Sequence, residues 1–324
     1  MEGIVKLDGD IWQVDLQERG IPGWSSAYFM KSEDSSGWML VETGASSSVE
    51  RLLGAANYIG IPSAAVKYIG VTHVHVDHAG ALGVLARHFQ EAEIWVHHRG
   101  IKHLADPERL IEGARAAYGE QKMGQYGEII PVPQENLCAA EEGVIIPLGG
   151  RPIEVWETPG HARHHVCFYD SKTKGLFSGD AAGVYLPGLS KLLHRFVTRP
   201  ATPGPDFDGD LMLQDLYRIS LSKAQILYFT HFGAAYPAQL LIELVIGQLL
   251  VHMQLARDYL GQEDASRNLC RALELQTKKG LLTSTPEERV CELPGYEQEL
   301  LLEPLHNSAD GLLSFLEKKG VFYE

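Results

Sequence analysis

Four side chains that can bind a metal ion fall within six residues of one another, directly after an apolar run at residues 66–71. Residues 72–80 read Thr-His-Val-His-Val-Asp-His-Ala-Gly. In an extended backbone, residues two apart point to the same side, so His73 and His75 can hold one ion together. Asp77 and His78 lie where the chain turns into a helix, so their side chains diverge toward a second position. This spacing predicts a metal centre and not a chance polar loop.

Three more strand ends each deliver one imidazole or carboxylate. A Thr-Pro-Gly-His segment ends at His161, a Ser-Gly-Asp segment ends at Asp180, and a Thr-His-Phe-Gly segment contains His231. Loops at strand ends are the usual place for functional groups on a rigid scaffold. Imidazole and carboxylate ligands without thiolate suit zinc, iron or manganese.

In this order and spacing, the motifs resemble those of the metallo-β-lactamase superfamily over residues 42–231. The sequence is most similar to the hydroxyacylglutathione hydrolase (glyoxalase II) and quorum-quenching lactonase branch. The resemblance implies an α/β fold, an αββα sandwich with two metal ions at one edge of the paired sheets. It also implies the metal ligands, which are His73, His75 and His161 for the first ion, Asp77, His78 and His231 for the second, and Asp180 as a bridge between both.

Three features depart from the pattern of this branch. Glu42 stands in a Val-Glu-Thr-Gly segment where the superfamily usually has Asp, a residue that supports the metal loops without binding metal. The lactonases place a tyrosine three residues after the bridging Asp, but Gly183 occupies that position here and the nearest tyrosine is Tyr185. The basic residues with which glyoxalase II binds glutathione have no counterpart that we can align. A glutathione thioester is therefore a less favoured substrate.

The ligand set predicts a binuclear metallo-hydrolase. Two divalent ions about 3.5 to 4 Å apart can share one water, lower its pKa toward 7 and present hydroxide to a carbonyl that one ion polarises. Asp77 is the expected catalytic residue, because it can orient that hydroxide or carry its proton. We expect hydrolysis of an ester, thioester or lactone bond in a small-molecule substrate, with two zinc ions or, alternatively, iron or manganese.

Two other functions fit the same motifs. An iron-dependent persulfide dioxygenase of the superfamily keeps many of these ligands around a single iron, and metal analysis with oxygen uptake would distinguish it. A binding or regulatory protein of the same fold would hold its metals but show little turnover on a broad panel. Flavodiiron oxidoreductases are disfavoured, because their first motif carries Glu where this chain has His75.

Four further histidines admit either a functional or a structural role. His165, four residues after His161, could support the metal ligands or pack in the core. His164 is expected at the surface. His97 and His98 follow a strand and precede a helix, which favours a surface or capping role over metal binding.

Other polar or aromatic residues are equally open. His194, Arg195 and Arg199 could meet a substrate carboxylate, although a solvated loop is the commoner setting for such residues. Trp24 could roof the metal cleft or fill a core. The serines at residues 46–48 lack the Gly-x-Ser-x-Gly elbow of a serine hydrolase, and a helix N-terminus explains them better.

The elements that must position these residues alternate along the first two thirds of the chain, as in a layered α/β domain. Short β-branched and aromatic runs predict strands at residues 27–31, 38–42, 66–72, 93–97, 153–157, 166–170, 175–178 and 226–230. Helices are predicted near residues 47–58, 79–89, 108–118 and 208–221. The Pro- and Gly-rich residues 199–208 predict a surface loop.

From Pro237 onward, apolar residues recur every three to four positions, which predicts a helical extension. The catalytic domain is thus expected at residues 1–236 and the extension at 237–324. Lys-Lys-Gly at residues 278–280 and 318–320 predicts two helix ends. Residues 240–253 are apolar almost all round, so this helix should close the active-site cleft or form a homodimer interface.

Length and composition narrow the classes of partner. The 324 residues exceed the roughly 250 to 300 at which one core usually stops growing, which predicts one large domain plus an appendage. A formal net charge of -14, with no dense Lys or Arg run, argues against nucleic acid. Four scattered cysteines and the lack of a signal-peptide core favour the cytoplasm. Polar residues interrupt the longest apolar stretch, so no membrane span is predicted.

Overall fold

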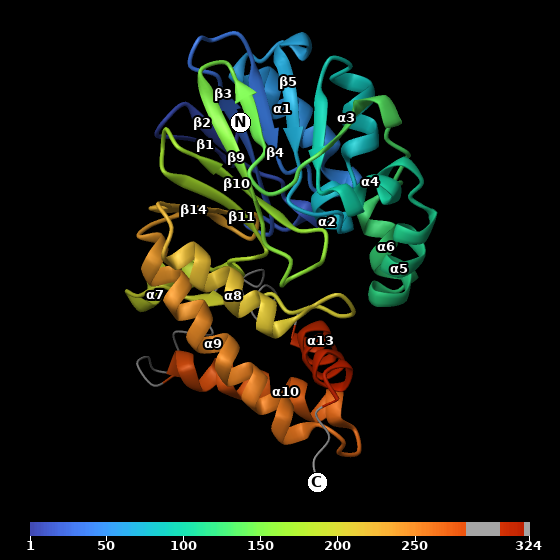
Figure 1. The fold of residues 1–324 in the computed structure, drawn as a ribbon, viewed down its shortest axis with the longest axis vertical. Coiled ribbons are helices and arrows are strands. Elements are labelled where there is room, and N and C mark those ends of the chain that lie inside the picture. Colours follow the sequence, from blue (N-terminus) through green and yellow to red (C-terminus); the bar gives the residue numbers. More distant parts are fainter. Residues whose placement is uncertain (283–304, 321–324) are drawn as a thin grey trace. The chain divides into compact units, whose positions relative to one another are not determined.

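The computed structural model describes residues 1–282 and 305–320, with side chains up to residue 277 and again from residue 305. Within this part, the chain forms two compact units that interleave along the sequence. Unit 1 comprises Met1–Glu157, His164–Gly179 and Ala224–Ala235, and unit 2 comprises Thr158–Arg163, Asp180–Lys223 and the residues from Tyr236 onward. Unit 1 holds both large sheets, and unit 2 holds the C-terminal helices (Figure 1).

One sheet of unit 1 has seven strands in sequence order. They are β1 (Ile4–Leu7), β2 (Ile11–Asp15), β3 (Ser26–Lys31), β4 (Trp38–Val41), β5 (Val66–Gly70), β6 (Glu93–Val96) and β7 (Leu137–Ala139). Neighbours are antiparallel from β1 to β4 and parallel from β4 to β7. Parallel neighbours need a crossover connection. The crossovers contain α1 (Val49–Ile59), α2 (Val76–Ala79), α3 (Leu82–His88), α4 (His98–Ala105), α5 (Glu108–Tyr118) and α6 (Glu120–Tyr126).

The other sheet of unit 1 has six strands in the order β15-β14-β11-β10-β9-β8. Their bounds are β8 (Ile145–Leu148), β9 (Arg151–Glu157), β10 (Val166–Asp170), β11 (Gly175–Gly179), β14 (Ile226–Phe229) and β15 (Gly233–Ala235). Only the pair of β11 and β14 is parallel.

The two largest apolar clusters among the described residues of unit 1 pack against its sheets. The first contains inward-facing side chains of both sheets, among them Tyr28 and Met39 from one and Phe168 and Phe177 from the other. The rings of Tyr28 and Phe177 meet edge to face at 5.3 Å. The second core joins the seven-stranded sheet to α1 and α3, which cover its outer face (Figure 1). These layers confirm the predicted α/β sandwich.

A buried arginine also links the two sheets. Arg151 in β9 donates from Nη2 to Oδ2 of Asp170 in β10 at 2.6 Å, and both side chains are fully buried. Across the sandwich, Nη1 of Arg151 donates to the carbonyl oxygens of Gly9, in the turn between β1 and β2, and of Lys31 in β3. Every charged or polar contact of this guanidinium is therefore made inside the sandwich, where an unpaired charge would be costly.

Unit 2 is mostly helical. Its helices are α7 (Pro187–Leu193), α8 (Gly209–Ser220), α9 (Ala238–Tyr259), α10 (Ala265–Leu282) and α13 (Leu305–Lys318). A short two-stranded sheet of β12 (Val184–Tyr185) and β13 (Thr198–Arg199) precedes α8. Asp208 caps α8, because its Oδ1 accepts from the backbone N–H groups of Asp210 and Leu211, both at 3.1 Å.

All eight predicted strands and four predicted helices are confirmed, with ends that differ by a few residues. The unpredicted strands include β12 and β13, which have two residues each and are too short to show an alternating pattern. The C-terminal helical region is confirmed, and α13 ends at Lys318 with Gly320 at φ 67°. The helix end predicted at residues 278–280 is wrong, since α10 continues to Leu282. The predicted domain boundary at residue 237 stays a prediction.

Helix α9 is long and apolar enough to cross a membrane by length and hydropathy alone. The core helix of a soluble protein passes the same test, and 44% of the most apolar window of α9 is buried in the structure. The side chains of Leu241, Val245 and Leu249 are fully buried, whereas Leu240 and Leu244 are exposed. One face of α9, with Leu241, Val245 and Leu249, is therefore packed inside the structure, and the face with Leu240 and Leu244 is not.

Candidate metal centre

The segment with the predicted first motif leaves the seven-stranded sheet at the end of β5. β5 ends at Gly70, and the backbone is extended at His75, where φ is -60° and ψ is 151°. Helix α2 then begins at Val76. As predicted, His73 and His75 precede the helix. Asp77 and His78 lie within it, because α2 begins at Val76, whereas the helix was predicted only from residue 79. His73 and His78 are fully buried, while Asp77 keeps partial access to solvent.

The imidazole rings of His73 and His75 each point one ring nitrogen toward the other ring. Nε2 of His73 lies 2.8 Å from Nδ1 of His75, and the two ring centres are 4.4 Å apart. The other nitrogen of His73 lies 3.1 Å from the hydroxyl of Thr72, which fixes the orientation of the ring. This geometry brings two imidazole nitrogens to one place, as the alternation along the extended segment predicts.

Asp77, His78 and His231 form a second group within unit 1. Their ligand atoms all lie within 4.8 Å of one another. Oδ2 of Asp77 lies 3.6 Å from Nε2 of His231 and 3.9 Å from Nε2 of His78. Oδ1 of Asp77 is buried without a hydrogen-bond partner among the described residues. The structure thus brings these three residues together in unit 1, and their role as ligands of one ion stays a prediction.

The backbone of another loop fixes the tautomer of His231. Nδ1 of His231 donates to the carbonyl oxygen of Trp24 at 2.9 Å, since a carbonyl can only accept. Nε2 therefore keeps its lone pair toward Asp77, as a metal ligand requires. Trp24 is buried and its ring lies 3.9 Å from the guanidinium of Arg19, so it has a structural role at this site.

Glu42 is the hub of the polar network behind these ligands. Its Oε2 lies 3.3 Å from Nδ1 of His78. Its Oε1 accepts from the hydroxyl of Thr72 at 2.5 Å and from the hydroxyl of Thr230 at 3.3 Å. Thr72 and Thr230 each precede a predicted ligand, so one buried carboxylate connects both loops. The structure thus gives Glu42 the supporting role that the superfamily assigns to Asp.

Gly179 makes room for this network. It has φ +48°, and a Cβ at this position would lie 2.4 Å from Oγ1 of Thr72 and 2.6 Å from Nε2 of His165. Because both distances are far below a normal contact, only glycine fits here. The glycine in the Ser-Gly-Asp motif is therefore required by the close approach of the Thr72 loop.

Two predicted ligands, His161 and Asp180, lie in unit 2. Nε2 of His161 is 3.4 Å from Oδ2 of Asp180, and both side chains are buried. Nδ1 of His161 donates to the carbonyl oxygen of Ala201 at 3.0 Å, which leaves Nε2 as the ligand atom. The chain links both residues to unit 1, because Asp180 follows Gly179 directly and His161 lies in the six-residue stretch Thr158–Arg163. A common ion for His73, His75 and His161, and the bridging role of Asp180, stay predictions.

The glycines of unit 2 explain two features of the motifs. A Cβ at Gly160 would lie 2.2 Å from the backbone of Met212, so the Thr-Pro-Gly-His turn packs directly on α8. Gly183 has φ +74°, and a Cβ there would lie 2.2 Å from the carbonyl oxygen of Arg199. Position 183 therefore cannot carry the tyrosine of the lactonases. Tyr185 lies in β12, with its ring 6.4 Å from that of Phe196.

Glu18 belongs to the electrostatics of the site and was not predicted from the sequence. It is 1% exposed and accepts from the hydroxyl of Ser25 at 3.1 Å. Burial, and next the negative charge of Asp77, raise the pKa of Glu18 to about 8. Burial and the same charge also raise the pKa of Tyr126. No local motif marks Glu18, because only the fold brings it near Asp77.

The remaining histidine predictions have mixed outcomes. His165 is fully buried, with its ring 5.0 Å from that of His73, so it packs against a predicted ligand. The surface prediction for His164 is wrong, because this residue is half-buried 5.6 Å from the ring of His75. The capping role of His97 is confirmed, since its Nδ1 accepts from the N–H group of Arg99 at 3.1 Å.

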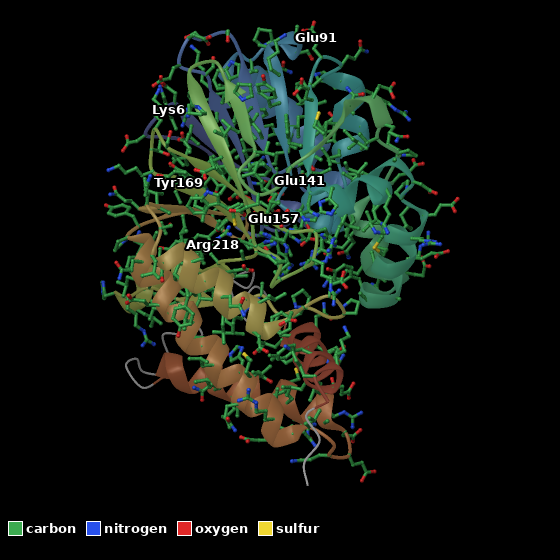
Figure 2. All side chains as sticks on the ribbon, in the orientation of Figure 1. Lys6, Glu91, Glu141, Glu157, Tyr169 and Arg218 are labelled. Atoms are coloured by element: carbon green, nitrogen blue, oxygen red, sulfur yellow. The ribbon has the colours of Figure 1, made fainter. Side chains whose placement is uncertain are left out.

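Two carboxylates accompany the pair of His97 and His98. Nε2 of His97 lies 3.5 Å from Oε1 of Glu157, and Nδ1 of His98 lies 3.4 Å from Oε1 of Glu141. The two glutamates are labelled in Figure 2. The ligand atoms of His97, His98 and Glu157 fall within 4.8 Å of one another. His98 is half exposed, so this group lies at the surface of unit 1.

The other open residues divide between structural roles and the surface. The serines at residues 46–48 directly precede α1, as the helix N-terminus interpretation predicts, but the side chain of the N-cap residue Ser48 makes no capping hydrogen bond. Ser46 donates instead to the carbonyl oxygen of Gly80 at 2.7 Å. His194 and Arg195 are exposed. The solvated-loop prediction is wrong for Arg199, because it lies in β13 and is only 5% exposed.

Comparisons with known proteins agree with this geometry. A family model for the metallo-beta-lactamase superfamily matches residues 20–231. A metallo-beta-lactamase fold-containing protein of Sulfurisphaera tokodaii is 30% identical over 168 residues, 51% of this chain and 60% of that protein. An acyl-coenzyme A thioesterase of Gallus gallus is 31% identical over 121 residues, 33% of this chain and 39% of that protein. The chain thus aligns with less than two thirds of the length of these curated relatives.

Solved structures show the same fold at lower identity. An archaeal metallo-beta-lactamase superfamily protein from Sulfolobus tokodaii aligns with a TM-score of 0.64 and 24% identity, over 90% of this chain and 93% of that one. A metallo-beta-lactamase family protein from Thermus thermophilus aligns with a TM-score of 0.61 and 19% identity, over 91% and 89% of the two chains.

Proposed function

The chain belongs to the metallo-beta-lactamase superfamily, and we propose that it is a metal-dependent hydrolase that cleaves an ester, thioester or lactone. The observation that carries this proposal is the group of Asp77, His78 and His231, whose ligand atoms lie within 4.8 Å of one another beside the pair of His73 and His75. Proteins of this superfamily bind divalent metals, and these residue types are the ligands that such ions prefer.

The donor atoms fit a divalent cation. Nε2 of His231 has its lone pair toward Asp77, because Nδ1 donates to a backbone carbonyl. Oδ2 of Asp77 lies 3.6 Å from Nε2 of His231 and 3.9 Å from Nε2 of His78, so one cation could bind all three atoms. Imidazole and carboxylate without thiolate suit zinc, with iron or manganese as alternatives.

We propose two ions, most simply zinc. Asp77, His78 and His231 would hold one of them, and His73, His75 and His161 the other, with Asp180 bound to both. The assignments of His161 and Asp180 follow the order of the motifs and the orientation of their side chains in unit 2. When bound, such a pair of ions supplies an activated water and a Lewis acid for the carbonyl oxygen.

The residues of the chain supply orientation and proton transfer. Oδ1 of Asp77 can accept a hydrogen bond from the attacking water, while Oδ2 remains with the two histidines. Oε2 of Glu42 lies 3.3 Å from Nδ1 of His78, and its charge favours the ring orientation that presents Nε2 to the site. Glu18 has a pKa of about 8 and is therefore mostly protonated at neutral pH, so it adds little negative charge beside Asp77.

A thioester is the substrate class to test first. The thioesterase relatives are 30% to 32% identical to this chain over a third of its length, which supports a hydrolase without fixing the acyl group. A glutathione leaving group remains disfavoured by the absence of the basic residues that glyoxalase II uses. The panel should therefore contain acyl-coenzyme A thioesters, aryl esters and acyl-homoserine lactones.

The test combines metal analysis with hydrolysis of this panel by the purified full-length protein. We expect close to two divalent ions per chain, and hydrolysis that a chelator abolishes and added zinc restores. Asp77→Asn should lower kcat at least 100-fold, whereas Asp106→Asn, a matched change at an exposed position of unit 1, should leave it unchanged. One iron per chain with oxygen uptake would indicate the dioxygenase instead. Full metal content without turnover would indicate a binding protein.

A further inference from the structure

Unit 2 contains a cavity of about 730 Å³ that the proposed hydrolysis does not use. Its walls come from β13 and the segment before it, from one face of α9 and from residues 276 and 277 of α10. The volume lies in the range of roughly 300 to 1,000 Å³ that is usual for small-molecule sites.

One wall of this cavity is an apolar stripe on α9. Leu240, Leu244 and Val251 line it and are 42%, 36% and 39% exposed. Their spacing puts them on one face of the helix, with Gly247 between them. Val197 and Phe196 add apolar surface from the segment before β13. A contiguous apolar wall of this kind is typical of a site that an apolar group covers.

The polar end of the cavity carries a buried cation. Arg199 lines the cavity, is 5% exposed, and its Nε has no hydrogen-bond partner among the described residues. Nη1 donates only a long bond of 3.5 Å to the carbonyl oxygen of Pro200. Burial lowers the pKa of the guanidinium to about 10, and the charge of Asp180 acts in the opposite direction. Arg199 is thus still positively charged at neutral pH, and its fork of donors is mostly unused.

Among the described residues, the other polar groups that line the cavity form no ion pair with Arg199. His252 is 4% exposed, and burial, with the charge of Arg199, lowers its pKa to about 4, so it is neutral at physiological pH. The hydroxyl of Thr198 donates to Oε1 of Gln248 at 3.3 Å. Glu243 is the only acidic residue in the lining within the described part of the chain, and it is exposed and accepts from Gln239 at 2.9 Å. His194 and Arg195 are exposed and add no negative charge.

We propose that this cavity binds a linear aliphatic carboxylate. The carboxylate pairs with the guanidinium of Arg199, and the chain lies along Leu240, Leu244 and Val251. A carboxylate matches the planar donor fork of Arg, and one negative charge balances the single buried cation. A dianionic phosphate would leave one charge without a partner beside a neutral imidazole. This site needs no metal, so it stands apart from the proposed hydrolysis.

Gly247 offers a variant that blocks the cavity and spares the fold. A Cβ at this position meets no atom within 4 Å, so a larger side chain would extend into open space. Replacing a glycine inside a helix by methionine also improves helix propensity. Gly247→Met should therefore fold and fill the apolar end. Arg199→Gln removes the charge at the other end, and Arg257→Gln is the matched control on the exposed side of α9.

The experiment measures binding of decanoate, decan-1-ol and decylammonium to the metal-loaded full-length protein by calorimetry. We expect one decanoate per chain, at least tenfold weaker binding of decan-1-ol, and no binding of decylammonium. Arg199→Gln should weaken the binding of decanoate 10- to 100-fold and leave the binding of decan-1-ol unchanged. Gly247→Met should abolish both, and Arg257→Gln should change neither.

A chelator distinguishes this cavity from the proposed metal centre, because decanoate held by metal ions would be lost with them. Binding that survives removal of the metals and disappears in Gly247→Met supports the proposal, whether or not the protein hydrolyses any ester. Decanoate that binds no tighter than decan-1-ol, or that binds Gly247→Met as well as wild type, would overturn it. Circular dichroism of each variant shows whether a loss of binding reflects a loss of fold.

Discussion

Glu42→Asp should weaken metal binding, even though it installs the residue that is usual for the superfamily. Oε2 of Glu42 lies 3.3 Å from Nδ1 of His78, while Oε1 accepts from the hydroxyls of Thr72 and Thr230. Asp is shorter by one carbon–carbon bond, about 1.5 Å. If the shortened carboxylate stays with the threonines, its distance to His78 grows to nearly 5 Å, roughly 1.5 Å too long for a hydrogen bond.

The expected magnitude follows from the role of the lost contact. Removing a carboxylate that orients a metal-binding imidazole typically costs about 10- to 100-fold in metal affinity, or about 1.4 to 2.7 kcal/mol. The change should not unfold the protein. Glu42 has φ 68°, a left-handed conformation that Asp tolerates better than Glu. Metal affinity should therefore fall while the metal-free protein keeps its melting temperature.

Competition with a chromogenic chelator measures the affinity of each ion. The matched control is Glu50→Asp, the same chemical change at an exposed position in the first turn of α1, and it should leave both affinities at the wild-type value. Equal affinities in Glu42→Asp and wild type would show that the backbone moves to restore the contact with His78. The reasoning from side-chain length would then be refuted.

Three further predictions concern metal content and stability. If Asp180 bridges two ions, Asp180→Ala should weaken the binding of both ions in a chelator titration, whereas Asp77→Ala should weaken the binding of only one. Wild-type metal content and activity in Asp77→Ala would contradict the proposed ion site at Asp77. Arg151→Met leaves the buried carboxylate of Asp170 unpaired and should lower the free energy of unfolding by about 3 to 5 kcal/mol, measured with urea; a loss below 1 kcal/mol would contradict the role of this pair. Burial, then the charge of Asp77, raise the pKa of Glu18 from 4.5 to about 8. Its contribution to stability is thus complete below pH 4.5 and is lost as the pH rises through 8. Metal-free Glu18→Gln should therefore gain stability relative to wild type between pH 5 and 8, by at most about 5 kcal/mol in urea melts. If the two proteins differ in unfolding free energy by the same amount at pH 5 and at pH 8, the pKa of Glu18 is not raised.

The motifs at the strand ends could be read from the sequence because their information is local. The spacing of His73 and His75 depends only on the alternation of an extended backbone, and the turn after them depends only on the start of α2. Their positions, and those of Asp77, His78 and His231 in unit 1, agree with the prediction. The strands were predictable for the same reason, since each carries its own apolar pattern.

The sequence predictions fail where an element is too short to show a pattern, or where residues far away in the sequence determine the burial of a side chain. The two-residue strands β12 and β13 show no period, and a Lys-Lys-Gly stop signal did not end α10. Arg199 looked like a residue of a solvated loop, but pairing of β13 with β12 buries its guanidinium. A charge pattern along the chain does not show which face of a segment the fold will cover.

The sequence by itself determined the identity and order of the predicted metal ligands and the class of fold, because ligand chemistry and backbone periodicity depend on a few neighbouring positions. Only the tertiary structure decided which residues surround and orient those predicted ligands. It brings Glu42 to His78, Trp24 to His231 and Glu18 near Asp77, across separations of tens to hundreds of residues. Burial and the distances between such side chains set their pKa values and orientations, and both quantities exist only after the sheets and loops have packed.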